Sequence, residues 1–179
     1  MTPQLVREAL VIALVAVAAY TDLRWTKIYN AATAPVIAAG LLLNALWGSD
    51  VGLLGAVEGV ALALGLFMLS QVCGGCMGGG DIKLLAAIGA VGGARFLLLS
   101  FCAATVIGAL MAIVTALRHR QLIATCSRCL ACGACRLGTG TAVPLDTGEG
   151  SLRIPYAVAI AGGVLACLAW SGGAGMWSP

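Results

Sequence analysis

The sequence has little charge: only 9% of its 179 residues are Asp, Glu, Lys or Arg, whereas 61% are hydrophobic. A soluble globular domain usually has about 25% charged and 45–50% apolar residues. The composition therefore excludes an ordinary water-soluble protein and indicates a membrane protein. The net charge of +3 is too small to indicate nucleic-acid binding.

The chain also lacks the basic start and small-residue cleavage site of a cleaved signal peptide, so its first apolar stretch is expected to be a membrane helix. A helix needs about 20 apolar residues to cross a hydrocarbon core roughly 30 Å thick. One stretch, residues 84–93, is short and either crosses with help from Gly92 and Gly93 or enters only part-way. We expect an all-α membrane protein of about six transmembrane helices, with a single domain over residues 1–179. The other candidate spans are residues 5–20, 31–47, 51–73, 96–117 and 154–172.

The basic residues predict the orientation of these spans, because cytoplasmic loops are enriched in Lys and Arg. Six crossings leave only Arg7 and Arg95, of the ten Lys and Arg residues, on the outer side. We therefore expect a multi-pass protein of the cytoplasmic (inner) membrane with both chain ends outside. Residues 118–153 then form a Cys-rich cytoplasmic loop.

Two of the seven acidic residues are candidates for a functional site, because ionisable groups near membrane helices are costly. Asp22 and Asp81 each mark a junction between an apolar span and the cytoplasmic boundary. Two crossings separate them, so both are expected on one face of the membrane. Two carboxylates brought together share one proton, because like charges about 3 Å apart do not both ionise easily. One can then act as a base on water while the other polarises a scissile carbonyl. This chemistry predicts an aspartic protease that requires no cofactor.

Glycines precede the second of these aspartates, in the run GGCMGGG at residues 74–80. Glycine permits positive φ and the close approach of another chain. The run is therefore expected to be a loop that holds Asp81 on an open bend, where an extended peptide could lie. The alternative is a flexible turn, with Asp81 and Asp22 as interface charges that pair with basic neighbours. Those neighbours are Lys83 for Asp81, and Arg24 or Lys27 for Asp22.

Two motifs resemble a known family. Residues 78–81, GGGD, fit the Gly-x-Gly-Asp signature of membrane aspartyl proteases, and IKLLAA at residues 82–87 is similar to the prepilin peptidase version. Residues 22–30, DLRWTKIYN, resemble the other signature of that family, Asp-x-Arg followed by Ile-Pro-Asn, with Tyr29 in place of the usual proline. IPY at residues 154–156 resembles the start of the family's final helix. The chain thus resembles the prepilin peptidase (type IV leader peptidase) family over about residues 6–172.

This resemblance implies an endopeptidase that removes the short basic leader of prepilins or pseudopilins, typically after a glycine, at the cytoplasmic membrane face. Longer members also have a cytoplasmic region with paired cysteine motifs near the N-terminus, and they N-methylate the new terminus. This chain has no insertion between its first two spans, so it resembles the short, peptidase-only form, without methyltransferase activity. The implied site residues are Asp22 and Asp81 for catalysis, Gly78 and Gly80 for shaping the loop, and Lys27 and Lys83 in support.

Six of the eight cysteines fall in two groups on the predicted cytoplasmic side. One is the pair Cys73 and Cys76, and the other is a run of four at three-residue intervals. In a reducing compartment metal binding is favoured over disulfides, and four thiolates suit tetrahedral zinc better than this spacing suits an iron–sulfur cluster. A structural zinc is predicted, and the alternative is a Cys-rich loop without metal. The candidate ligands are Cys126, Cys129, Cys132 and Cys135.

Two other functions fit the sequence less well. A transporter needs a polar track near the bilayer midplane, and apart from Glu58 the spans contain little that ionises there. A small membrane metal or redox protein centred on residues 126–135 would make both aspartate motifs incidental. The expected partners are therefore a prepilin or pseudopilin precursor and the lipid bilayer, and not a nucleic acid.

Overall fold

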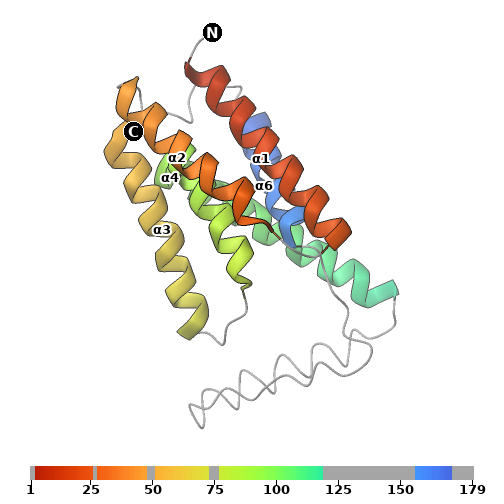
Figure 1. The fold of residues 1–179 in the computed structure, drawn as a ribbon. Helices are drawn as coiled ribbons and strands as arrows, with labels where there is room; N and C mark the ends of the chain where they lie inside the picture. Colours follow the sequence, from red (N-terminus) through yellow and green to blue (C-terminus); the bar gives the residue numbers. More distant parts are fainter. Residues whose placement is uncertain (1–2, 26–27, 48–50, 73–76, 119–155, 171–179) are drawn as a thin grey trace. The chain divides into compact units, whose positions relative to one another are not determined.

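The computed structural model describes residues 3–25, 28–47, 51–72, 77–118 and 156–170, in which the regular structure is helical. These residues belong to two compact units. The first runs to Gly108 and includes α6, and the second contributes residues 109–118 at the end of α4. Within the second unit the Thr115 hydroxyl donates to the Met111 carbonyl at 2.7 Å. The helices are α1 (Pro3–Trp25), α2 (Asn30–Leu46), α3 (Gly52–Val72), α4 (Gly79–Arg118) and α6 (Tyr156–Trp170) (Figure 1).

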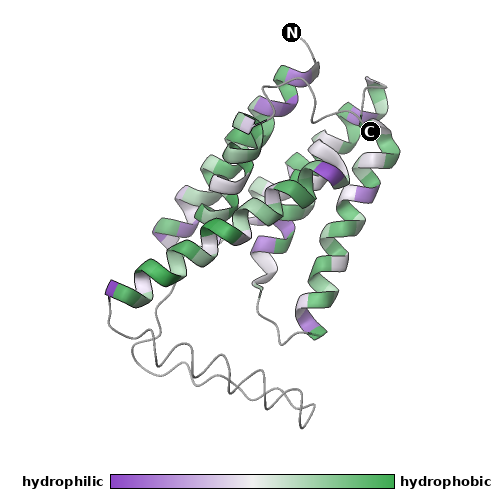
Figure 2. Ribbon diagram, turned by 180° about the vertical axis from the view of Figure 1, so that it is seen from behind, coloured by the Kyte–Doolittle hydropathy of each residue, from purple (hydrophilic) through white to green (hydrophobic). Residues whose placement is uncertain are grey.

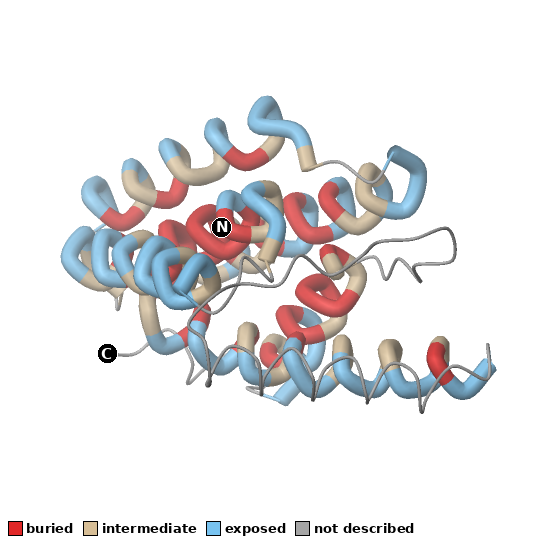
Figure 3. The backbone as a smooth tube through the Cα atoms, turned by 90° about the horizontal axis from the view of Figure 1, so that it is seen from below, coloured by how far each residue is buried: buried red, intermediate tan, exposed pale blue. Residues whose placement is uncertain are grey.

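The surfaces of these helices suit a lipid environment. Three of them, α3, α4 and residues 4–25 of α1, are long and apolar enough to cross a membrane, and α2 and α6 are shorter apolar helices. Large apolar side chains lie on the outside, such as Leu54 of α3, which is 80% exposed. Apolar residues cover most of each helix (Figure 2), and buried positions form strips between exposed sides (Figure 3). Such apolar surfaces match lipid, and in a helix the backbone groups are satisfied internally. The protein is an all-α membrane protein.

The first part of α4 is the most enclosed segment, since every residue from 84 to 93 is buried. Around it, α1 packs against α2 and α6, and α2 packs against α3. Glycines allow the backbones to touch, because a Cβ at Gly89 of α4 would lie 2.6 Å from the Gly59 carbonyl oxygen of α3. A Cβ at Gly40 of α2 would lie 2.9 Å from the Ala90 carbonyl oxygen. Close packing at small residues is a common way for membrane helices to associate.

One residue inside α4 is not helical: Gly93 has φ 77° and ψ 177°, a conformation that glycine adopts readily. A break there disrupts the helical hydrogen bonds that would cross it. The buried Asn44 amide donates to the carbonyls of Ala90 at 2.9 Å and Val91 at 3.3 Å. Its Oδ1 accepts a hydrogen bond from the buried Arg7 guanidinium at 2.7 Å. Side chains from α1 and α2 therefore stabilise the break.

The structure adds detail to the predicted spans in two places. The predicted spans 84–93 and 96–117 correspond to the two helical parts of α4, which meet at a kink at the non-helical Gly93 and run in different directions around it (Figure 1). No polar turn separates them, so one glycine makes the change of direction. The first helix also continues past residue 20 to Trp25, which places Asp22 inside α1. Arg24 in the last turn favours this longer helix, because a cation stabilises the negative end of the helix dipole.

Candidate active site

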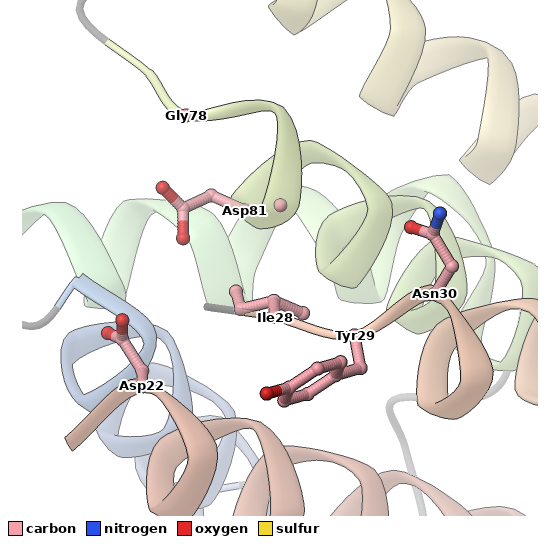
Figure 4. A pocket seen from close by; sticks show the side chains of 7 residues that line it. Asp22, Ile28, Tyr29, Asn30, Gly78 and Asp81 are labelled. Atoms are coloured by element: carbon pink, nitrogen blue, oxygen red, sulfur yellow. The ribbon is translucent and has the colours of Figure 1, made fainter. Parts of the chain in front are cut away.

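The structure brings Asp22 and Asp81 to the same pocket. Asp22 lies near the end of α1 and Asp81 in the first turn of α4. Figure 4 shows their carboxylates directed into one space. The pocket has a volume of about 440 Å³. Its other lining residues are Ile28, Tyr29, Asn30, Gly78 and Gly80.

The first turn of α6 holds Asp22 in place. The backbone N–H of Ala157 donates to Oδ2 of Asp22 at 3.1 Å, and Ala157 is the second residue of α6. The first N–H groups of a helix lack partners inside the helix, and the positive end of the helix dipole favours an anion. This contact therefore both orients the carboxylate and satisfies a backbone donor. Asp22 joins the end of α1 to the start of a helix far away in the sequence.

Asp81 lies on a helix and not on the glycine-rich bend that the sequence suggested. The N–H groups of Asp81 and Ile82 donate to the Gly78 carbonyl at 3.1 and 3.4 Å, so the helix has already begun at Gly79. The Asp81 carboxylate in turn accepts a hydrogen bond from the Gly78 N–H. This reciprocal pairing between the residue before the helix and its third residue is a capping arrangement that satisfies backbone donors. An acidic residue there also suits the helix dipole.

The two outer glycines of the Gly-x-Gly-Asp motif provide room and not unusual backbone angles. Positive φ occurs, among the described glycines, at Gly52 and Gly93. A Cβ at Gly78 would instead lie 3.2 Å from the Asp81 carboxylate, and a Cβ at Gly80 would lie 3.1 Å from Cβ of Ile28. The missing side chains therefore allow the carboxylate to fold back on the chain and the Ile28 segment to lie against α4.

The basic residues near the pocket bind groups other than the two aspartates. Lys83 donates to Oδ1 of Asn30 at 2.7 Å, which ties the first turn of α4 to the start of α2. Arg24 donates to the Tyr20 hydroxyl at 2.9 Å and lies 5.4 Å from the centre of the Trp25 ring. These contacts weaken the interpretation of the aspartates as ordinary ion-pair partners of Arg24 and Lys83. Lys27, the other expected supporting residue, lies outside the described residues.

Sequence reasoning gave no role to three residues that line the pocket, namely Ile28, Tyr29 and Asn30. The signal was present, because all three belong to the motif at residues 22–30. What it did not indicate was that this segment forms a wall between Asp22 and Asp81. The contact of the Ala157 amide with Asp22 was also missed. A backbone N–H is present whichever amino acid stands at that position, so the sequence does not indicate this contact.

The predicted zinc ligands Cys126, Cys129, Cys132 and Cys135 lie outside the described residues, as do Cys73 and Cys76. Among the residues that are described, no group of three or more His, Cys, Asp or Glu side chains could hold a metal ion. The zinc site therefore stays a prediction. The pocket itself offers two carboxylates beside a tyrosine hydroxyl and an amide, and paired carboxylates are suited to acid–base hydrolysis.

In comparisons with known proteins, residues 9–113 match the Type IV leader peptidase family. This region contains both aspartates and the pocket-lining residues. A relative, the prepilin leader peptidase/N-methyltransferase of Bacillus subtilis (strain 168), is 37% identical over 112 residues. The aligned region covers 61% of this chain and 44% of the relative, so the chain spans less than half of that protein. No solved structure matches the chain significantly.

Proposed function

This chain belongs to the type IV leader peptidase family, and we propose that it is an aspartic endopeptidase acting on type IV prepilin-like or pseudopilin precursors. It removes their leader peptide by hydrolysis of one peptide bond. The observation that carries this proposal is the shared pocket, which Asp22 and Asp81 line from two different helices. The family match alone does not require these two residues to meet, and their meeting supplies the pair that the reaction needs.

The proposed reaction uses the two carboxylates in complementary protonation states. The ionised carboxylate removes a proton from water as the water oxygen attacks the scissile carbonyl carbon. The protonated carboxyl donates its proton to the carbonyl oxygen, which gives a tetrahedral intermediate. That intermediate collapses when the C–N bond breaks and a carboxyl group returns a proton to the leaving amine. The products are a leader with a new carboxyl end and a mature chain with a new amino end.

Two carboxylates in a small pocket are arranged for this division of labour. Asp22 lies close enough to Asp81 for the two charges to repel each other, and both side chains are only partly exposed. Like charges in such a place do not both ionise easily, so the pair retains one proton. The contacts with Ala157 and Gly78 restrict the two side chains, and fixed catalytic groups lower the entropic cost of reaching the transition state.

We place the pocket at the cytoplasmic face of the inner membrane. Arg24 lies two residues after Asp22 in α1, and Lys83 lies two residues after Asp81 in α4. Basic residues are enriched on the cytoplasmic side of membrane proteins. The substrate there is a precursor whose basic leader remains cytoplasmic while its apolar segment lies in the bilayer.

The proposed activity is peptidase without N-methyltransferase. Helix α1 ends at Trp25 and α2 begins at Asn30, so no separate domain fits between the first two helices. In longer members of the family this is where the additional cysteine-containing region is expected. Neither comparison supports the alternative of a small redox protein centred on residues 126–135. The proposed catalysis needs no cofactor, and a zinc on the four cysteines would be structural.

The experiment that tests the function is processing of a co-expressed type IV prepilin, followed by blotting of precursor and mature forms. The variants are Asp22→Asn and Asp81→Asn, which retain size and remove the acid. Glu58→Gln is the matched control, because Glu58 is an exposed acidic residue of α3 away from the pocket. Membrane levels of all variants are measured in the same samples.

We expect the wild type and Glu58→Gln to process the precursor, and both aspartate variants to accumulate it at normal membrane levels. Normal processing by either aspartate variant would show that the residue is not catalytic. A wild type that leaves several prepilins and pseudopilins uncut would contradict the substrate class.

A further inference from the structure

Tyr156 is the first residue of α6 and stands directly before the residue that holds Asp22. The N–H of Ala157, which donates to Oδ2 of Asp22 at 3.1 Å, belongs to the peptide unit that Ala157 forms with Tyr156. A peptide unit is planar and nearly rigid, so the direction of this N–H depends on how Tyr156 is held. Tyr156 is not among the residues that line the pocket, so its effect on the site is indirect.

The side chain of Tyr156 is held by the second part of α4. Its ring lies against Gly108, where a Cβ would stand 3.4 Å from Cε2 of Tyr156. Its hydroxyl forms a hydrogen bond with the side chain of Thr105, one turn before Gly108. The Thr105 hydroxyl donates its single hydrogen to the Phe101 carbonyl at 2.8 Å, so Tyr156 is the donor in the bond with Thr105. The tyrosine is therefore held both by its ring and by its hydroxyl.

The body of α6 lies against the same part of α4. A Cβ at Gly163 would stand 2.5 Å from the Ser100 carbonyl oxygen and 2.5 Å from the Ala104 backbone nitrogen, so the two backbones touch there. Helix α6 also packs against α1 (Figure 1). Helix ends fray more readily than helix centres. The bond between Tyr156 and Thr105 extends the contact with α4 to the first turn of α6, which is the end that meets Asp22.

The second aspartate also lies near Tyr156. The negative charge of Asp81 acts on the Tyr156 hydroxyl, and the charge of Asp22 acts on Asp81. Tyr156 is thus connected to Asp22 through the adjacent peptide unit and lies within electrostatic reach of Asp81. A displacement of Tyr156 would therefore affect both members of the pair.

We propose that Tyr156 is a positioning residue, whose hydroxyl bond to Thr105 fixes the first turn of α6 and thereby the carboxylate of Asp22. This inference rests on the proposed peptidase function and names two residues outside the pocket on which the catalytic pair depends. Loss of the bond leaves the residues that line the pocket unchanged, so substrate binding is retained. The Asp22 carboxylate becomes less restricted, and the chemical step slows because catalytic groups must be held in the reactive geometry.

The test uses single hydroxyl groups. Tyr156→Phe removes the donor and retains the ring, Thr105→Val removes the acceptor at nearly the same size, and Thr105→Ser retains the acceptor. Thr115→Val is the matched control, because the Thr115 hydroxyl makes the same kind of bond within α4, to the Met111 carbonyl at 2.7 Å. We measure kcat and KM on one prepilin precursor with purified protein in detergent, below the unfolding midpoint of every variant.

We expect kcat to fall about tenfold in Tyr156→Phe and in Thr105→Val, with KM close to the wild-type value, because small displacements of a catalytic group have effects of this size or larger. Thr105→Ser and Thr115→Val should have about the wild-type kcat. The double variant of Tyr156→Phe with Thr105→Val should be no slower than the single variants, since both changes remove the same bond.

A wild-type kcat in Tyr156→Phe would overturn the proposal, as would an equal fall in Thr115→Val or a loss that lies in KM alone. A Thr105→Ser variant as slow as Thr105→Val, or losses that multiply in the double variant, would show that the two side chains do not act through one hydrogen bond. A wild type that cuts no prepilin precursor would contradict the peptidase function itself, whereas normal cleavage by Tyr156→Phe contradicts only the role of Tyr156.

Discussion

Gly78 lies directly against the carboxylate of Asp81, so that a Cβ at position 78 would stand 3.2 Å from Oδ2. Two residues further on, a Cβ at Gly80 would stand 3.1 Å from Ile28, whereas a Cβ at Gly79 would meet no atom within 4 Å. The contacts thus give a physical reason for the motif Gly-x-Gly-Asp. Its outer glycines are required by what they touch, and its middle position is free.

Gly78→Ala is expected to lower kcat/KM for precursor cleavage about tenfold or more, because the added methyl group moves the Asp81 carboxylate from its place. Small displacements of a catalytic group have effects of this size or larger. Gly79→Ala is the matched control and should cleave at about the wild-type rate, since its methyl group points into open space. Equal rates in Gly78→Ala and wild type would contradict this account of the motif.

Gly80→Val is expected to reduce cleavage as well, by pushing the Ile28 segment away from α4. Ile28 and Tyr29 carry one wall of the pocket, so the wall moves with them. The second change Ile28→Ala should restore part of the activity, because it removes the outer atoms of Ile28, which lie 3.5 Å from a Cβ at position 80. No recovery in the double variant, at equal membrane level, would show that the contact with Ile28 is not the cause.

The crossing of α3 and α4 provides a test of stability. A Cβ at Gly59 would overlap the backbone of Gly89, whereas a Cβ at Gly65 of the same helix would meet nothing within 4 Å. Gly59→Ala should therefore destabilise the protein, by about 1–3 kcal/mol as expected for overpacking. Gly65→Ala should be neutral or slightly stabilising, because alanine is the better helix former. Thermal unfolding in detergent measures both, and equal midpoints would contradict the predicted close packing.

Asn44 should be needed for the break in α4. Asn44→Leu removes the donor to the Ala90 and Val91 carbonyls and the acceptor for Arg7, and a buried polar group left without its partner costs about 1–3 kcal/mol. Ser70→Ala is a suitable control, because its hydroxyl donates to the carbonyl of Phe67 in its own helix. We expect a clear fall in the unfolding temperature for Asn44→Leu and little change for Ser70→Ala. The reverse order would argue against the role given to Asn44.

The sequence predicted the pair of aspartates because each carries a local motif, and because counting the spans placed them on one side of the membrane. Their meeting in one pocket is consistent with that reasoning, while their catalytic role stays a proposal. The membrane class followed from composition, and the apolar surfaces of α3 and α4 agree with it.

Other features depend on contacts between distant residues, which periodicity and spacing do not reveal. In the sequence nothing distinguishes Asn44 from other polar residues. The structure shows that its amide donates to the carbonyls of Ala90 and Val91. The glycines before Asp81 suggested a bend, because a glycine chosen for close approach looks the same in sequence as one chosen for positive φ. Gly93 is the opposite case, since there a positive φ does occur, and it lies at the kink between the two predicted spans.

The most direct test of the central claim, that Asp22 and Asp81 act as one catalytic unit, is a comparison of kcat/KM for Asp22→Asn, Asp81→Asn and the double variant. The rates are measured on one purified precursor, with equal folding verified by thermal unfolding. Residues that act together show strongly non-additive losses. We predict that each single variant loses about a thousandfold or more and that the double variant is no slower than the singles. Losses that multiply in the double variant, or near-normal cleavage by either single variant, would contradict the claim.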